Sequence, residues 1–330
     1  MTSQRDHGGG LDAACAQYGG TRADWIDLST GINPDPYPMP PVSMDAWAAL
    51  PDAAALDQLV QNARRFWNVP DKAAVLAAPG ASALIAQIPY LRPAATVSIP
   101  APTYNEHAAS FRMAGWAVLD HPAQAEASVI VHPNNPDGAY FAAPDSLLTI
   151  IDESFCDIAP EKSLVDAAHR PGTLILKSFG KFWGLAGLRL GFAIGDQALI
   201  AALKDRLGPW SVAGPALTIG AKALADITWA NATRARLAKD AETLDAMVEG
   251  AGAKRVGGTS LFRLYDTAHA ASWQAELARH HIWTRIFPYS ETWLRVGLPP
   301  ASGWSRLQTA LADLRSTQQP GPTAEPITHP

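Results

Sequence analysis

The sequence predicts an α/β fold built on a mostly parallel sheet covered by helices. Three observations support this class. Short apolar runs alternate with stretches of helical periodicity, and most of these runs are too continuous to be half-exposed strands. The 330 residues, 48% of them hydrophobic, are also enough to bury a substantial core. This length further predicts two lobes rather than one.

Six apolar runs are the expected strands of the sheet: 74–78, 95–99, 128–132, 147–151, 173–176 and 188–194. Leu56, Leu59, Ala63 and Phe66 recur at helical spacing, so we expect an amphipathic helix over 54–68 with one face on the core. A second helical pattern covers 83–91. These elements belong to the larger lobe.

The last third of the chain predicts a smaller lobe. A helical pattern runs over 215–250, and strand-like runs follow at 261–264, 282–286 and 293–296. The proline-rich residues 37–41 indicate an extended arm. We therefore divide the chain into an N-terminal arm (1–45), a large domain (46–208), a small C-terminal domain (209–315) and a flexible tail (316–330).

Composition excludes several classes of function. The 26 Lys and Arg residues against 31 Asp and Glu give a net charge of -5, which argues against nucleic acid or an anionic membrane as partner. No apolar stretch is long enough to span a bilayer, and the polar first ten residues predict a cytoplasmic protein. Cys15 and Cys156 form neither a disulfide framework nor metal-ligand spacing, so we expect no metal.

The most informative motif is the stretch 178–191, which follows the apolar run 173–176. It places Lys181 and Arg189 around a glycine-punctuated turn. An amine fixed there can form a Schiff base with an aldehyde cofactor, and the arginine can clamp that cofactor's phosphate. The pattern indicates pyridoxal phosphate chemistry. Lys177 competes with Lys181 on these grounds, and a lone lysine at such a junction is usually just solvated.

A second motif, Gly80-Ala81-Ser82, follows the expected strand 74–78 and opens a helical pattern. Free backbone N–H groups and the helix dipole at this point would face an anion, so the motif suggests a phosphate-binding turn. Glycine and serine also begin many helices that bind no ligand. On its own the motif leaves both interpretations open.

Together these motifs resemble the fold-type I pyridoxal phosphate enzymes of the class I/II aminotransferase group. The likeness is to the cobalamin-pathway threonine-phosphate decarboxylases, themselves similar to histidinol-phosphate aminotransferases, and it runs from about His7 to Pro299. It implies a large domain with a mostly parallel sheet, a smaller α+β C-terminal domain, a pyridoxal 5'-phosphate cofactor and a homodimer.

The resemblance also implies residue roles. Lys181 would carry the cofactor, Asp152 would pair with its pyridine nitrogen, and Tyr104 would stack on its ring. For Asp152 and Tyr104 the alternatives are a helix-capping aspartate and a core tyrosine. The implied cofactor-binding residues are Gly80, Ala81, Ser82, Tyr104, Asn135, Asp152, Ser178, Lys181, Arg189 and, from the partner subunit, Tyr37.

The implied substrate-binding residues are His7, Gly8, Asn33, Asn135, Arg285 and Arg295. Arg285 and Arg295 fall on neighbouring expected strands, and two guanidinium forks suit a molecule with both a carboxylate and a phosphate. His7, Gly8 and Asn33 resemble arm residues that fold over the substrate. Without the resemblance, His7 would be a disordered terminal histidine.

Two positions depart from the family pattern. Gly180 stands where the family commonly has a hydroxyl, so one phosphate hydrogen bond is missing or comes from water. Phe155 stands where many aminotransferases carry a tyrosine that donates to the cofactor's phenolic oxygen. Loss of this tyrosine hydroxyl should raise the proton affinity of the Schiff base nitrogen, which argues mildly against a straightforward transaminase.

The function expected from this resemblance is decarboxylation of L-threonine O-3-phosphate to (R)-1-aminopropan-2-yl phosphate in cobalamin biosynthesis. Serine phosphate is a further substrate candidate. The alternatives are a histidinol-phosphate or related aminotransferase, and, from another class, a noncatalytic pyridoxal phosphate-binding protein that contacts the next enzyme of the cobalamin pathway.

Overall fold

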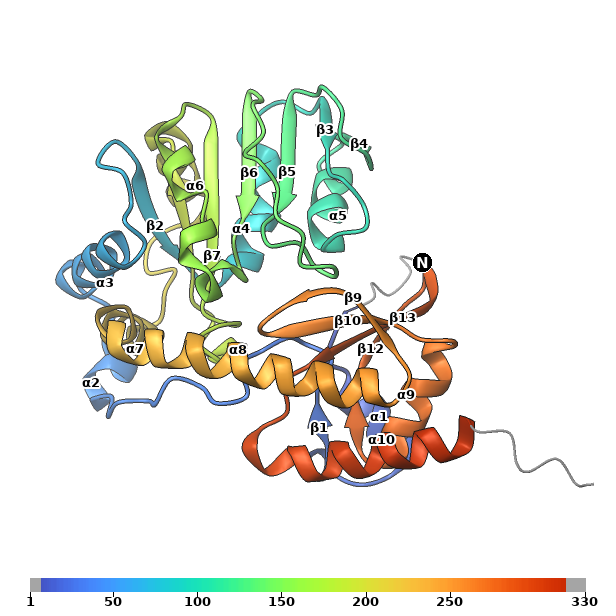
Figure 1. The fold of residues 1–330 in the computed structure, drawn as a ribbon. Helices are drawn as coiled ribbons and strands as arrows, with labels where there is room; N and C mark the ends of the chain where they lie inside the picture. Colours follow the sequence, from blue (N-terminus) through green and yellow to red (C-terminus); the bar gives the residue numbers. More distant parts are fainter. Residues whose placement is uncertain (1–6, 319–330) are drawn as a thin grey trace, which may run out of the picture.

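The computed structural model describes residues 7–318 and contains two lobes, with the long helix α8 (Ile227–Gly250) running between them in Figure 1. The upper lobe in that view surrounds a seven-stranded sheet, and the lower lobe surrounds a four-stranded one. The large sheet lies within the range expected for the large domain, and the four-stranded sheet within that expected for the small one.

The large sheet has the strand order β2-β8-β7-β6-β5-β3-β4. Its strands are β2 (Ala74–Ala78), β3 (Thr96–Ser98), β4 (Ala117–Leu119), β5 (Ala127–Val131), β6 (Leu148–Asp152), β7 (Thr173–Ser178) and β8 (Gly191–Gly195). Only β8 runs against the others, which confirms the mostly parallel sheet. Every residue of β5, β6 and β8 is buried, which explains their continuous apolar runs.

The prediction that a strand begins at residue 188 is wrong. Residues Ala186–Leu188 form a 3-10 turn, and Arg189 follows in the left-handed region with φ 51°. The strand begins only at Gly191. No residue with a side chain can replace Gly191, because the added Cβ would lie 2.4 Å from the backbone nitrogen of Ala81. This close approach brings the turn that carries Arg189 next to the start of α4 (Ala81–Gln87).

Helices cover the large sheet. They are α3 (Ala53–Phe66), α4, α5 (Asn105–Met113), α6 (Gln197–Leu207) and α7 (Gly214–Ala225), with the short α2 (Met44–Ala48) at the edge of the lobe. Helix α3 confirms the amphipathic helix expected over 54–68. The single helix expected over 215–250 is instead two, α7 and α8, because the Asp226 side chain accepts a hydrogen bond from Trp229 N and caps a new helix.

The small lobe pairs β12 (Arg285–Phe287), β13 (Ser290–Gly297), β10 (Phe262–Asp266) and β9 (Lys254–Thr259) in one antiparallel sheet. The N-terminal arm joins this lobe, because β1 (Ile26–Asp27) pairs with β11 (Ile282–Trp283). Its helices are α1 (Leu11–Tyr18), α9 (Ala270–Arg279) and α10 (Trp304–Gln318). Helix α10 includes the first three residues of the expected tail, and 319–330 lie outside the described residues.

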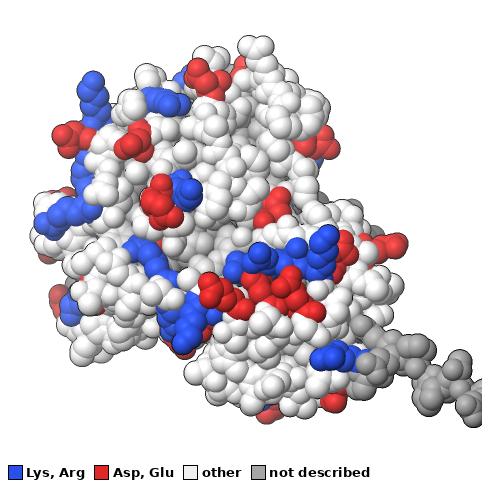
Figure 2. All heavy atoms as spheres, in the orientation of Figure 1, with Lys and Arg blue, Asp and Glu red and all other residues white. Residues whose placement is uncertain are grey.

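Charges of both signs are intermixed on the face shown in Figure 2, where they gather over α8. One such pair within α8 joins Arg236 and Asp240 at 3.0 Å. No helix among residues 7–318 combines the length and the apolar character needed to cross a membrane.

Candidate active site

Most of the predicted cofactor residues meet at one edge of the large sheet. Strands β3, β5, β6 and β7 are parallel, so their carboxyl ends lie together, which is where ligands bind in such sheets. Asp152 ends β6, and Lys181 follows β7 by three residues. A cavity of ≈160 Å³ opens there, lined by Ala81, Ser82, Ile85, Tyr104, Val131, Asn135, Asp152, Ser154, Phe155, Ser178, Gly180, Lys181, Ala186 and Arg189.

Lys181 presents its amine to this cavity in a poorly solvated setting. Its Nζ donates to the carbonyl oxygen of Thr30 at 3.2 Å and lies 5.1 Å from the ring centre of Phe155. Burial, together with the positive charge of Arg295, lowers the pKa of Lys181 from 10.5 to about 8, although the carboxylate of Asp152 opposes the shift. Near neutral pH, a larger fraction of this amine is therefore unprotonated than of an ordinary lysine.

The competing lysine, Lys177, is placed quite differently. It is 1% exposed, and its Nζ lies 2.5 Å from a Glu153 oxygen and 3.6 Å from an Asp157 oxygen. Burial alone would lower the pKa of Lys177, but the two carboxylates raise it above the ordinary value. Lys177 stays charged and does not line the cavity, so the geometry favours Lys181 as the reactive amine.

Asp152 is a buried carboxylate held in place by hydrogen bonds. His107, on α5, places Nε2 at 2.8 Å from Oδ2, and Ser154 donates from its hydroxyl at 2.5 Å and its backbone nitrogen at 3.0 Å to Oδ1. Burial would raise the pKa of Asp152, but the bonds from His107 and Ser154 outweigh it and lower that pKa. Because an ionised carboxylate only accepts, His107 donates.

Sequence reasoning missed His107. The side chain is 1% exposed and lies three residues after Tyr104, whose ring it meets edge-on at 6.0 Å. The spacing Tyr-x-x-His is the only local indication, because residues three apart share a helix face. The partner, Asp152, lies 45 residues away in sequence and becomes a neighbour only through the sheet.

The opposite end of the cavity suits a phosphate. Gly80 has φ 86°, and a Cβ there would lie 2.4 Å from an Arg189 guanidinium nitrogen, so only glycine lets that guanidinium lie against the start of α4. The Ser178 hydroxyl lies nearby and accepts from the backbone nitrogen of Gly180 at 3.2 Å. An anion at this point meets a guanidinium, a hydroxyl and helix-start N–H groups.

These donors fit pyridoxal phosphate. The turn at Gly80 can accept the phosphate, the buried carboxylate of Asp152 matches a protonated ring nitrogen, and Lys181 lines the same cavity. Tyr104 borders the same space. The arrangement can therefore bind a flat, phosphorylated aldehyde through Lys181.

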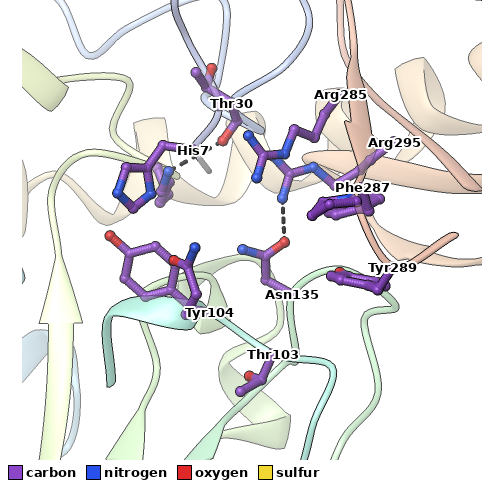
Figure 3. A pocket seen from close by; sticks show the side chains of 13 residues that line it. His7, Thr30, Thr103, Tyr104, Asn135, Arg285, Phe287, Tyr289 and Arg295 are labelled. Carbon is purple, nitrogen blue, oxygen red and sulfur yellow. Dashed lines mark hydrogen bonds between the residues drawn. The ribbon is translucent and has the colours of Figure 1, made fainter. Parts of the chain in front are cut away.

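A second cavity of ≈360 Å³ continues from the first and shares Tyr104, Asn135 and Lys181 with it. Figure 3 shows its side chains. Arg285 and Arg295 enter it from β12 and β13, where they are direct partners across the strand pair. Arg295 donates to the side-chain oxygen of Asn135 and to the carbonyl oxygen of Ser29. Two guanidinium groups thus stand in one cavity beside the reactive amine.

The N-terminal arm lies over this second cavity. His7 places Nε2 at 3.0 Å from a Glu106 oxygen, and both His7 and Gly8 line the cavity. The arm is fixed at Gly9, whose backbone nitrogen donates to the Ser29 hydroxyl at 2.7 Å and whose carbonyl oxygen accepts from the Trp283 indole at 2.9 Å. His7 is thereby brought beside Tyr104 (Figure 3).

Asn33 and Tyr37 line neither cavity. Asn33 is 2% exposed, donates to the Phe182 carbonyl oxygen at 2.9 Å and accepts from Arg236 at 2.6 Å, so its side chain ties the arm to the loop that carries Lys181. The expected contact between Asn33 and substrate stays a prediction. The Tyr37 ring packs edge-on against Trp229 at 5.1 Å within its own chain, so its contact with a partner's cofactor stays a prediction.

Sequence comparisons identify the family of the chain. Residues 23–313 match the family described as aminotransferase class I and II. A protein from Sinorhizobium sp named threonine-phosphate decarboxylase is 43% identical, covering 94% of this chain and 99% of the relative. Another of that name, from Pseudomonas aeruginosa, is 36% identical and covers 93% and 97%.

Two solved structures show the shared fold. A histidinol-phosphate aminotransferase from Sinorhizobium meliloti, in complex with pyridoxal-5'-phosphate, aligns with a TM-score of 0.81 at 19% identity over 96% of each chain. An L-threonine-O-3-phosphate decarboxylase from Porphyromonas gingivalis aligns with a TM-score of 0.71 at 17% identity, covering 88% of this chain and 99% of the other. The chain therefore belongs to the aminotransferase class I and II family.

Proposed function

We propose that this protein is a pyridoxal phosphate-dependent decarboxylase that converts L-threonine O-3-phosphate to (R)-1-aminopropan-2-yl phosphate and carbon dioxide in cobalamin biosynthesis. The observation that carries the proposal is the pair Arg285 and Arg295, set opposite each other in a cavity that reaches Lys181. Two such groups suit a small molecule with a carboxylate and a phosphate. The names of the relatives at 43% and 36% identity support this substrate.

Pyridoxal phosphate, when bound, supplies an electron-accepting ring that takes up the electron pair left by the departing carboxylate. Asp152 keeps the ring nitrogen protonated, because its carboxylate is held ionised by His107 and Ser154. Arg189 and Ser178 bind the phosphate group of the cofactor. Asp152, Ser178 and Arg189 all line the first cavity.

The second cavity selects the bond that breaks. Arg285 and Arg295 bind the two anionic groups of the substrate, which sets the direction of the carbon–carboxylate bond relative to the cofactor ring. Tyr104 borders both cavities and limits movement of the ring. Lys181, whose amine lies in both cavities, returns a proton to the carbon that lost carbon dioxide.

The function is tested by supplying threonine phosphate to the holoenzyme without any keto acid. We expect one carbon dioxide for each aminopropanol phosphate, measured by release of labelled gas from the carboxyl carbon and by NMR of the product. Turnover seen only with histidinol phosphate and 2-oxoglutarate would instead establish an aminotransferase. Bound cofactor with no turnover of either substrate would establish a binding protein.

Serine phosphate, measured in the same assay, tests the contribution of the substrate methyl group. One methyl group is worth about 1–3 kcal/mol in an apolar pocket. We therefore expect kcat/KM for serine phosphate to be roughly 10- to 200-fold below that for threonine phosphate. Equal values for the two substrates would show that the cavity does not recognise the methyl group.

The low pKa of Lys181 predicts how cofactor uptake depends on pH. Only the unprotonated amine attacks an aldehyde, and a pKa of about 8 means that this form appears at lower pH than for an ordinary lysine. The rate of uptake by the apoprotein, followed by stopped-flow absorbance, should rise to half its maximum near that pKa. Arg295→Gln removes a neighbouring positive charge and should move the midpoint upward. A midpoint near 10.5 in the unaltered protein would contradict the structure.

We also propose a homodimer, acting in the cytoplasm, in which Tyr37 reaches the partner's cofactor. Large apolar side chains are exposed just after Tyr37: Met39, Met44, Trp47 and Leu50 are 65–76% exposed. Such a cluster is typical of an interface. Contact with the next enzyme of the cobalamin pathway stays a prediction.

The dimer proposal predicts that Trp47→Glu weakens self-association, because a charge replaces an apolar side chain at the interface. Sedimentation equilibrium should show a dimer dissociation constant at least about tenfold higher than for the unaltered protein. Leu147→Glu is the matched control, since Leu147 is 67% exposed and lies before β6, at the opposite end of that strand from Asp152. Equal association by all three proteins would refute this interface.

A further inference from the structure

The β12–β13 pair carries an aromatic side chain to which the proposed function gives no role. Phe287 lies two residues after Arg285 on β12, so the two side chains leave the strand on the same face. Its ring is 7% exposed and lines the second cavity. Figure 3 shows this ring beside the side chains of Arg285 and Arg295.

Both guanidinium groups lie near the ring of Phe287. The guanidinium carbon of Arg285 is 5.4 Å from the ring centre, and that of Arg295 is 6.0 Å from it. Both distances fall in the range of cation–π attraction, in which a positive charge meets the negative face of the ring. Arg295 has a further ring contact, with Phe262 at 5.3 Å.

The two arginines repel each other before an anion arrives. They are direct partners in an antiparallel pair, where like charges opposite each other are destabilising. Arg295 is fixed by bonds to Asn135 and Ser29. Arg285 is half-buried, and its guanidinium is attracted to the Phe287 ring, which also attracts the guanidinium of Arg295. Attraction of both guanidinium groups to the Phe287 ring therefore offsets part of the repulsion.

We propose that Phe287 is a positioning residue for anion recognition, whose ring holds Arg285 and Arg295 side by side before the substrate binds. When the two arginines are already ordered, substrate binding loses less free energy to the ordering of long side chains. The inference rests on the proposed substrate class, a small molecule with two anionic groups, and is independent of which substrate bond breaks.

The test replaces Phe287 with phenylalanine carrying one, two or three ring fluorines, which nearly preserve its size while weakening the negative face. Inorganic phosphate is titrated into each holoenzyme by calorimetry, with Arg285→Gln identifying the heat that arises at this site. We expect the phosphate dissociation constant and KM for threonine phosphate to rise stepwise, to about 5-fold with three fluorines. The value of kcat and the melting temperature should stay unchanged.

Two further variants separate positioning from packing. Phe287→Leu keeps an apolar side chain without a ring and should weaken phosphate binding at least as much as three fluorines do. Phe287→Tyr keeps an aromatic ring and should bind phosphate like the unaltered protein. Phe111, which packs on Trp116 in the large lobe, receives the same three fluorines as the matched control and should show no change in phosphate binding.

Three results decide between the proposals. A dissociation constant and KM that do not vary with fluorine number, or that vary equally at Phe111, overturn the positioning role. A graded phosphate response without carbon dioxide release supports the role of Phe287 and refutes the decarboxylase. Carbon dioxide release with an ungraded response refutes the role of Phe287 alone.

Discussion

Lys181→Ala is expected to lower carbon dioxide release by at least about 10⁴-fold, because it removes both the amine that binds the cofactor and the group that returns a proton. The amine lies in both cavities, and burial with Arg295 holds its pKa near 8. Initial rates with threonine phosphate, at saturating added cofactor, measure the loss. The purified variant should also lack the covalently bound yellow form of the cofactor.

The control for Lys181→Ala is folding of the apoprotein. The Lys181 amine makes one described hydrogen bond, to Thr30, so the denaturation midpoint of the apo variant should match that of the unaltered apoprotein. Borohydride reduction of the unaltered holoenzyme, followed by peptide mapping, should label Lys181 and leave Lys177 unlabelled. Label on Lys177, or turnover retained by the alanine variant, would contradict the assignment.

Lys177→Ala is expected to destabilise the protein by about 3–5 kcal/mol, because it leaves buried carboxylates without their cation. Glu153 and Asp157 lie 2.5 and 3.6 Å from the Lys177 amine and are 1% and 4% exposed. Breaking a buried pair costs more than the pair contributes, since the remaining charges are no longer compensated. The melting temperature of the apoprotein should fall by roughly 4–7 °C.

A double substitution, Lys177→Met with Glu153→Gln, provides the control. It removes the cation and one anion together, so its stability should lie well above that of Lys177→Ala. Ser163 and the backbone nitrogen of Leu164 donate to different oxygens of Glu153. In the glutamine variant the remaining oxygen can accept from Leu164, and the side-chain amide can donate to the Ser163 hydroxyl. An alanine variant as stable as the unaltered protein would show that the buried pair is not a structural requirement.

Local patterns were sufficient for much of the fold. The run 74–78 predicted β2, because a largely buried strand is a continuous run of apolar residues. The pattern over 54–68 predicted α3, because a helix that buries one face repeats its apolar residues at helical spacing. The division of 215–250 into two helices was missed. Asp226 interrupts the pattern through a side-chain cap, which hydrophobic periodicity does not report.

The site was predictable where a residue follows a strand or sits in a turn. Asp152 and Lys181 both follow apolar runs, and the structure brings them to one sheet edge because these runs form neighbouring parallel strands. Gly80 was predictable as the start of a helix. The sequence did not show that glycine is required there because the Arg189 guanidinium packs against it. Asn33 was assigned to the substrate, whereas tertiary contacts direct its side chain to Phe182 and Arg236.

The sequence by itself determined the α/β class, the cofactor chemistry and the order of the motifs, because these depend on residue type and short-range period. Only the tertiary structure supplied a physical reason to prefer Lys181, the lysine that the family resemblance implied, over Lys177. Two buried carboxylates pair with the Lys177 amine, whereas burial and the charge of Arg295 lower the pKa of Lys181. It also joined His107 to Asp152 and Arg295 to Asn135 across 45 and 160 residues. Contacts of that length arise from the packing of whole strands and lobes, which no local pattern encodes.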